Sequence, residues 1–186
     1  LFVIIGITIG SFVNALVWRL KTKKNWVSER SVCTHCGHTL SALDLVPVIS
    51  YVFLRGRCRY CKKRIEDSPL VEVFVGLAFL LSYIYWSYSL SGVGLFRFVV
   101  WLFALVLLAA MFLYDLRWTI LPDKLTRSLL ALAVIQLIVL SAMREISVHE
   151  IAATTLSVLV GGGIFHLIYQ LSNGKYIGGG DVKLGY

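Results

Sequence analysis

Residues 177–184 read Ile-Gly-Gly-Gly-Asp-Val-Lys-Leu and follow an apolar segment, 150–171, that is long enough to span a bilayer. The three glycines allow positive φ angles and close approach of another chain segment. Near a bilayer, irregular backbone persists only where it is buried in protein or lines a wet cavity. An ionisable residue at such a place indicates function and requires a partner. Asp181 is therefore the first candidate for a catalytic residue.

The best partner for Asp181 is Asp115, which begins the stretch Asp-Leu-Arg-Trp-Thr-Ile-Leu-Pro-Asp after the apolar segment 95–114. Asp115 sits at the carboxyl end of a helix, where the helix dipole disfavours a negative charge. A carboxylate placed against that cost indicates a functional role. If the two acids face each other, like-charge repulsion makes them share one proton. Aspartic proteases use this arrangement.

Capping is the alternative explanation for acids at helix boundaries. Asp123 follows Pro122 and is expected to cap the next helix, because Asp is a favoured N-cap residue. Asp181 could likewise cap a helix that begins at Val182. The preceding glycines favour a mobile, approachable loop at Asp181 instead.

The composition excludes a soluble globular protein. Hydrophobic residues make up 58% of the chain and charged residues only 15%, against about 25% in soluble domains. Four spans and a partial one are predicted at 1–18, 70–89, 95–114, 125–142 and 150–171. The first lacks a preceding basic region and a cleavage site, so we expect a retained helix and not a signal peptide. The sequence thus predicts an all-α polytopic membrane protein, a bundle of transmembrane helices with a small polar domain inserted after the first span.

The positions of Lys and Arg predict the orientation in the membrane. Eleven of the eighteen lie between residues 19 and 69, and only Arg97 and Arg144 fall on the opposite side. Positive charge marks the cytoplasmic side, so we expect the first loop, Asp115 and Asp181 to be cytoplasmic. The net charge of +8 is explained by this bias and by anionic membrane lipid, without a nucleic-acid partner.

The polar loop carries all four cysteines of the chain, Cys33, Cys36, Cys58 and Cys61. Two C-x2-C pairs separated by 21 residues are typical of a four-thiolate zinc site. The alternative is two disulfides or redox pairs, which a reducing cytosolic face disfavours. The pattern therefore favours a structural zinc ion.

Two polar residues in apolar segments need an explanation. Asn14, in the first span, requires a partner on another helix and follows Gly6-x-x-x-Gly10, a spacing that allows close helix packing. Glu72 lies in the first turn of the second span, where a carboxylate interacts favourably with the helix dipole. The alternative for Glu72 is a pocket shared with the zinc loop.

Together these motifs resemble the type IV prepilin peptidases, the leader peptidases and N-methyltransferases of pilus, competence and type II secretion systems. Residues 10–20 (Gly-Ser-Phe-Val-Asn-Ala-Leu-Val-Trp-Arg-Leu) are similar to the family's first-span signature, and Lys21 replaces a Pro often found next. The two cysteine pairs, residues 54–58 and residues 69–72 resemble its cytoplasmic loop. Residues 115–123 and the Gly-Gly-Gly-Asp at 178–181 resemble its two catalytic motifs. The family usually continues with further spans, which we expect beyond this sequence.

The resemblance implies roles for individual residues. Asp115 and Asp181 would form the catalytic pair of a G-x-G-D intramembrane aspartyl protease, with Gly178 and Gly180 in the active-site loop. The substrate would be a prepilin or pseudopilin, cleaved after a Gly where its basic leader meets its apolar helix. Methyl transfer from S-adenosylmethionine would involve the zinc loop, with Glu72 as a candidate methylase or substrate residue.

The resemblance also implies a location, the bacterial inner membrane, with the zinc loop and the catalytic acids at its cytoplasmic face. We expect three parts: a first transmembrane helix (1–18), a zinc-binding loop domain (19–69) and a helical protease core (70–186). One alternative function is a transporter or channel with a cytoplasmic zinc domain. Another is a membrane-anchored nucleic-acid binder.

Overall fold

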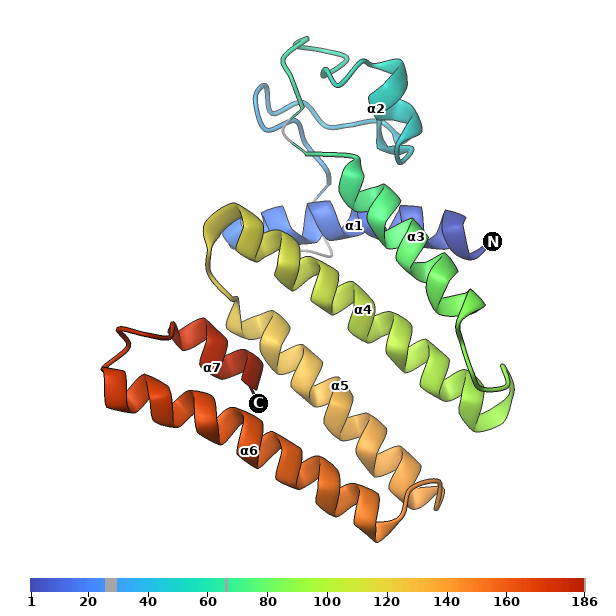
Figure 1. The fold of residues 1–186 in the computed structure, drawn as a ribbon. Coiled ribbons are helices and arrows are strands. Elements are labelled where there is room, and N and C mark those ends of the chain that lie inside the picture. Colours follow the sequence, from blue (N-terminus) through green and yellow to red (C-terminus); the bar gives the residue numbers. More distant parts are fainter. Residues whose placement is uncertain (26–29, 66, 186) are drawn as a thin grey trace. The chain divides into compact units, whose positions relative to one another are not determined.

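A computed structural model describes residues 1–25, 30–65 and 67–185, and within these ranges the chain is mostly helical, with a largely irregular polar loop after the first helix (Figure 1). The helices are α1 (Phe2–Thr22), η1 (Ala42–Leu45), α2 (Ile49–Phe53), α3 (Leu70–Ile84), α4 (Gly92–Trp118), α5 (Asp123–Ala142), α6 (Val148–Ser172) and α7 (Gly179–Gly185). The chain forms two compact units, Leu1–Leu116 and Arg117–Tyr186. Each unit is described separately below.

The all-α membrane fold predicted from the sequence is confirmed. Helices α1, α4, α5 and α6 are long and apolar enough to cross a bilayer. Helix α3 is shorter than the predicted span 70–89, because it ends at Ile84 after 15 residues. At about 1.5 Å per residue it reaches about 22 Å, less than the roughly 30 Å of a hydrocarbon core.

In the first unit, α1 crosses α3 at closely packed backbones (Figure 1). A Cβ atom added at Gly6 would lie 2.7 Å from Cα of Gly76, and one added at Gly10 would lie 2.6 Å from Cα of Glu72. Only glycine fits at these positions, as the Gly-x-x-x-Gly spacing predicted. The crossing therefore places the first turn of α3, with Glu72, directly against α1.

The buried Asn14 finds its partner at the same crossing. Its side chain is 5% exposed, and its Nδ2 donates a 3.4 Å hydrogen bond to the backbone oxygen of Ser68, just before α3. Below it, Val75 and Phe79 of α3 pack with Ala109 of α4 in the core of this unit. The amide thus secures the end of α3 that faces the polar loop.

In the second unit, the short helix α7 packs against α6 (Figure 1). Helix α6 begins with a capping box between Ser147 and Glu150, and it ends at Asn173 in the left-handed conformation (φ 49°). A Cβ atom at Gly185 of α7 would lie 2.7 Å from the Phe165 ring and 3.3 Å from the Gly161 oxygen. The glycines of α6 therefore let α7 approach its backbone closely.

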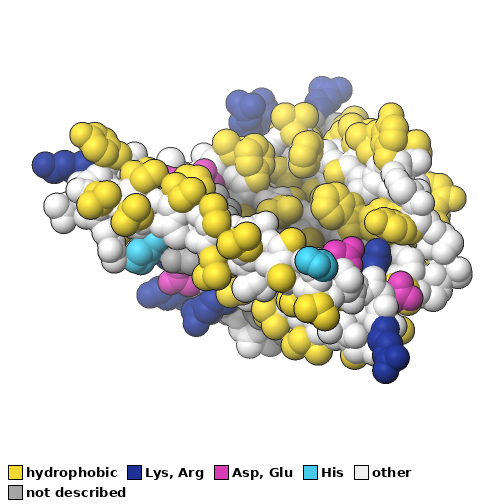
Figure 2. Space-filling model, turned by 60° about the horizontal axis from the view of Figure 1, so that its bottom comes forward, with side chains coloured by type: hydrophobic (Ala, Val, Ile, Leu, Met, Phe, Trp, Pro, Cys, Tyr) yellow, Lys and Arg dark blue, Asp and Glu magenta, His cyan; other side chains and the backbone are white. Residues whose placement is uncertain are grey.

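Apolar side chains remain exposed along the long helices. Only 6% of the most apolar stretch of α6 is buried. In the most apolar stretch of α4 the buried share is 22%. Hydrophobic side chains cover much of the face seen in Figure 2. Lipid contact explains such exposure, which water would disfavour.

Candidate functional site

The four cysteines come together in the polar loop of the first unit. Their sulfur atoms all lie within 4.8 Å of one another, although the two pairs are separated by 21 residues in sequence. The Cys33 and Cys61 sulfurs are 3.9 Å apart, far beyond the roughly 2.05 Å of a disulfide bond. Such a cluster of four sulfur donors can bind one metal ion.

The two cysteine pairs adopt the same backbone turn. In the first, the Gly37 N–H donates to the Cys33 oxygen at 2.9 Å; in the second, the Lys62 N–H donates to the Cys58 oxygen at 3.0 Å. Gly37 and Lys62 both have positive φ, 68° and 60°. An isolated β-bridge closes each turn, Val32 with Thr39 and Arg57 with Arg64. The cluster is therefore built from two equivalent knuckles, which the sequence indicated only by the repeated C-x2-C.

The electrostatics of the cluster suit a metal. For Cys33, burial raises the pKa, but hydrogen bonds from the backbone of Cys36 and His35 lower it to about 6. For Cys36, a backbone hydrogen bond from His38 lowers the pKa, but desolvation and the neighbouring thiols raise it to about 11. One thiolate thus makes the next harder to form, and a cation between the sulfurs would remove this conflict.

Neither histidine of the loop joins the cluster in the structure. His35 Nε2 lies 3.2 Å from the backbone oxygen of Arg64. The ring centroids of His38 and Tyr60 are 3.6 Å apart. Both histidines therefore tie the first knuckle to the second.

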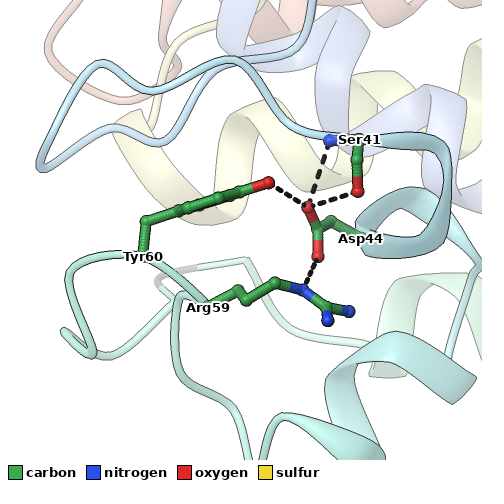
Figure 3. Close-up of polar contacts among 4 residues, drawn as sticks. All are labelled: Ser41, Asp44, Arg59 and Tyr60. Atoms are coloured by element: carbon green, nitrogen blue, oxygen red, sulfur yellow. Dashed lines mark hydrogen bonds and ion pairs between the residues drawn. The ribbon is translucent and has the colours of Figure 1, made fainter.

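Asp44 fastens the second knuckle to η1 (Figure 3). One carboxylate oxygen accepts from the Arg59 Nε at 2.6 Å, and the other accepts from the Ser41 hydroxyl at 2.7 Å and the Tyr60 hydroxyl at 3.3 Å. The Asp44 side chain is only 3% exposed. Burial alone would raise the pKa of Asp44, but the hydrogen bonds from Ser41 and Arg59 lower it to about 2. The only local signal for Asp44 in the sequence is the capping-box pattern Ser41-x-x-Asp44, which does not indicate the contact with Arg59.

Glu72 faces a cavity of about 370 Å³ between α1, the polar loop and the start of α3. Its wall includes three carboxylates, one arginine and several aromatic rings: Asp44, Asp67, Glu72, Arg19, Phe12, Trp18 and Tyr51. The cavity falls in the size range of small-molecule sites. Its charged groups are mostly acidic, which favours a ligand that carries positive charge.

The Glu72 carboxylate also holds the edge of the loop. Its Oε2 accepts a 2.5 Å hydrogen bond from the Val48 N–H. Val48 has φ 60° and ψ −51°, and the Ile49 N–H donates to the Pro47 oxygen at 2.5 Å. This is a γ-turn with positive φ, a rare and strained conformation for a β-branched residue. Such strain at a cavity wall is typical of functional sites.

Asp115 lies in the last turn of α4 and is exposed. Its carboxylate and Asp181 belong to different units, so their pairing stays a prediction.

Asp181 is the third residue of α7, and its carboxylate turns back to the start of the helix. Its Oδ2 accepts a 3.1 Å hydrogen bond from the Gly178 N–H, while the Asp181 N–H donates to the Gly178 oxygen at 3.1 Å. This is the acidic half of a capping box. The helix begins at Gly179, three residues before the start at Val182 that a capping role for Asp181 would require. A hollow of about 310 Å³, lined by Asp181, Phe165, Ile177 and Gly185, adjoins the carboxylate.

The expectation that Asp123 caps α5 is wrong. The N-cap residue is Pro122, Asp123 is the first residue of the helix, and its side chain makes no capping hydrogen bond. The Asp123 carboxylate instead pairs with the ammonium group of Lys183 on α7. No local sequence pattern indicates which acid Lys183 meets, so this pair could not be predicted from the sequence.

Comparison with known proteins identifies both halves of the chain. Residues 4–86 match the family described as "Bacterial Peptidase A24 N-terminal domain", and residues 102–185 match the "Type IV leader peptidase family". No solved structure matches the chain significantly.

Three curated relatives illustrate the similarity. A "Prepilin leader peptidase/N-methyltransferase" of Vibrio cholerae is 33% identical over 202 residues, which cover 99% of this chain and 73% of the relative. The "Type 4 prepilin-like proteins leader peptide-processing enzyme" of Escherichia coli is 33% identical over 144 residues, 67% of this chain and 51% of the relative. A Burkholderia pseudomallei relative with the same name as the Vibrio protein is 34% identical over 154 residues, which cover 69% of this chain and 48% of the relative. The chain spans about half the length of these last two relatives. Because the similarity to the Vibrio protein runs along nearly the whole chain, and both halves match the corresponding families, the protein belongs to the type IV leader peptidase family.

Proposed function

We propose that this protein is a membrane aspartyl endopeptidase that removes the leader peptide of prepilin-like proteins. The observation that carries the proposal is the placement of Asp181, exposed at the start of α7 and held by the Gly178 N–H beside an apolar hollow. Family membership supports the same activity, because the relatives are named as leader peptidases. The hollow would receive an apolar side chain next to the scissile bond.

Asp115 and Asp181 would share the chemistry of peptide hydrolysis. The ionised carboxylate takes a proton from water, and the resulting hydroxide attacks the scissile carbonyl carbon. The protonated carboxyl group polarises the carbonyl oxygen and then donates its proton to the leaving nitrogen. The products are a leader that ends in a carboxylate and a mature pilin with a new amino terminus.

The charge distribution supports a site at the cytoplasmic face of the bacterial inner membrane. The loop 19–69 and the segments that follow Asp115 and Asp181 carry most of the Lys and Arg residues. Anionic lipid and a prepilin or pseudopilin are then the expected partners, and no nucleic acid is required. The proposed parts are the first helix (1–18), the zinc loop domain (19–69) and the protease core (70–186).

We also propose that Cys33, Cys36, Cys58 and Cys61 hold one structural zinc ion. Four sulfur donors within 4.8 Å fit the tetrahedral site that zinc prefers. With all four ligands supplied by protein, the site is closed and serves folding, not catalysis.

We further propose that the cavity in front of Glu72 binds S-adenosylmethionine, a methyl donor that would serve the N-methyltransferase activity named for two of the relatives. This molecule carries a sulfonium, an ammonium and a carboxylate, and the cavity offers Glu72 and Asp67 for the cations and Arg19 for the carboxylate. Trp18 and Tyr51 offer faces for the adenine ring. When bound, the cofactor supplies an electrophilic methyl group. Residues of the chain would orient it and shield it from water.

Cleavage of a leader-bearing pilin by the purified protein in detergent tests the proposed function. We expect the wild-type protein to release the leader, and Asp115→Asn and Asp181→Asn to release none while they retain their metal and their expression level. A transporter or channel would leave the pilin intact. Absence of cleavage by a folded, metal-loaded wild-type protein would therefore overturn the assignment.

Binding of S-adenosylmethionine in the absence of pilin tests the cavity without turnover, because this molecule carries the sulfonium and ammonium charges that the acidic groups would meet. We expect binding by calorimetry that is weakened in Glu72→Gln and unchanged in Asp181→Asn, which lies in the other unit. Unchanged binding in Glu72→Gln would remove Glu72 from the cofactor site.

A further inference from the structure

The helix that carries Asp181 cannot hold its position alone. Helix α7 has seven residues, Gly179–Gly185, and helices shorter than about 12 residues are marginal in isolation. Its position, and so the position of the Asp181 carboxylate, depends on contacts with the rest of the second unit.

These contacts fall on two faces of α7. Residues Asp181 and Gly185 are four apart and share one face, which meets Phe165 of α6 around the hollow. Residues Gly180 and Lys183 are three apart and share another face, which meets the connection between α4 and α5.

The second face is held by one close contact and one ion pair. A Cβ atom at Gly180 would lie 3.1 Å from Cδ1 of Leu121, so the helix backbone rests on that leucine. Two residues after Leu121, the carboxylate of Asp123, the first residue of α5, accepts a hydrogen bond from Lys183 Nζ. The pair joins residues that are 60 positions apart in sequence.

The exposure of the pair indicates what it can and cannot do. The Asp123 and Lys183 side chains are 60% and 45% exposed. An exposed ion pair adds little to the free energy of unfolding, because water and salt screen it. It can still select one orientation of a short helix, and catalysis is sensitive to displacements of about 1 Å.

We infer that Asp123 and Lys183 form a positioning pair for Asp181. Within the second unit, the pair holds α7 against the start of α5. This inference rests on the proposed peptidase function, and it assigns a role in the reaction to two residues that do not contact the substrate.

Charge reversal and exchange test the pair. Asp123→Lys and Lys183→Asp should each lower kcat for leader cleavage by roughly 10- to 100-fold, with KM nearly unchanged, because orientation and not substrate binding is lost. The double variant Asp123→Lys/Lys183→Asp restores the attraction and should recover most of kcat. Lys124→Asp, one residue further along α5, is the matched control and should cleave at nearly the wild-type rate.

Hydrogen exchange of residues 179–185 gives a second measurement that does not depend on turnover. Exchange should accelerate in both single reversals and return toward the wild-type rate in the double variant. If a reversed variant fails to insert, the uncharged Asp123→Asn and Lys183→Met replace it and should show the same two effects. A wild-type protein that cleaves no pilin would refute the proposed function, while the exchange measurement would still test the pair.

Two results would overturn the inference. One is single variants whose kcat and exchange match the wild type. The other is a double variant as slow as the single ones, which would show that each residue acts separately.

Discussion

The Val48 N–H donates a 2.5 Å hydrogen bond to the Glu72 carboxylate, and this bond joins the first turn of α3 to a strained turn of the polar loop. The same carboxylate lines the 370 Å³ cavity. Glu72 thus has a structural contact and a candidate binding role, which different substitutions can separate.

Glu72→Gln keeps an oxygen acceptor for the Val48 N–H but removes the charge, whereas Glu72→Ala removes both. We expect Glu72→Gln to lower methyl transfer by roughly 10-fold or more, since a hydrogen bond to a charged group contributes about 1.5–3 kcal/mol. Cleavage should remain close to normal, and exchange of the Val48 amide should rise only in Glu72→Ala. Equal loss of cleavage and methylation in both variants would instead indicate a packing role.

Gly10→Ala should weaken the crossing of α1 and α3. The new Cβ would lie 2.6 Å from Cα of Glu72, and backbone cannot move aside as a flexible side chain can. Overpacking of this kind lowers the free energy of unfolding by about 1–3 kcal/mol. The loss is measured as a lower temperature of thermal unfolding in detergent. Gly163→Ala is the control, because no atom lies within 4 Å of its added Cβ. If both variants unfold at the same temperature, the crossing is looser than described.

The purified protein should contain about one zinc per chain, with four sulfur ligands in X-ray absorption spectra. Cys58→Ser, at the buried cysteine, should lose the metal and disorder the loop, because metal binding supplies the folding free energy of such domains. His35→Ala should keep the metal. A metal-free protein with an equally ordered loop would contradict the zinc assignment.

Asp44 should stabilise the second knuckle in a pH-dependent way. Its folded pKa of about 2 lies below the roughly 3.9 of an unfolded chain, so its contribution is complete above pH 4. The contribution is lost as the pH falls from about 4 to about 2. Exchange of residues 57–64 should therefore be faster in Asp44→Asn than in the wild type at neutral pH. This difference in exchange rate between the variant and the wild type should shrink in acid. Loss of the metal in acid affects both proteins alike, so a difference that persists to pH 2 would contradict this account.

Asp181→Asn should abolish cleavage and leave α7 intact. An asparagine oxygen can still accept from the Gly178 N–H, whereas Asp181→Ala loses both the charge and this bond. We expect neither variant to release product. Amide hydrogen exchange of residues 179–182 should be faster only in the alanine variant. The double variant Asp115→Asn/Asp181→Asn should be hardly worse than either single one, because the two acids act as a unit. Cleavage by Asp181→Asn near the wild-type rate would refute the aspartyl mechanism.

The sequence by itself determined the membrane class, the long helices and the residues of the cysteine cluster. Hydrophobic runs of fixed length have few structural solutions in lipid, because every backbone polar group must be satisfied within the segment. The paired C-x2-C spacing likewise restricts the cysteines to one kind of cluster. The Gly6-x-x-x-Gly10 spacing predicted a close helix contact but could not name α3 as the partner.

Only the tertiary structure decided which groups meet across long stretches of chain. Asp44 pairs with Arg59, Glu72 with Val48, and Asp123 with Lys183 instead of capping its own helix. Local preference predicted a cap for Asp123, because an Asp after Pro at a helix start commonly serves as one. In the folded protein the ammonium group of Lys183, 60 residues away in sequence, pairs with the Asp123 carboxylate. The packing of α7 sets the position of Lys183, and no local sequence pattern encodes that packing.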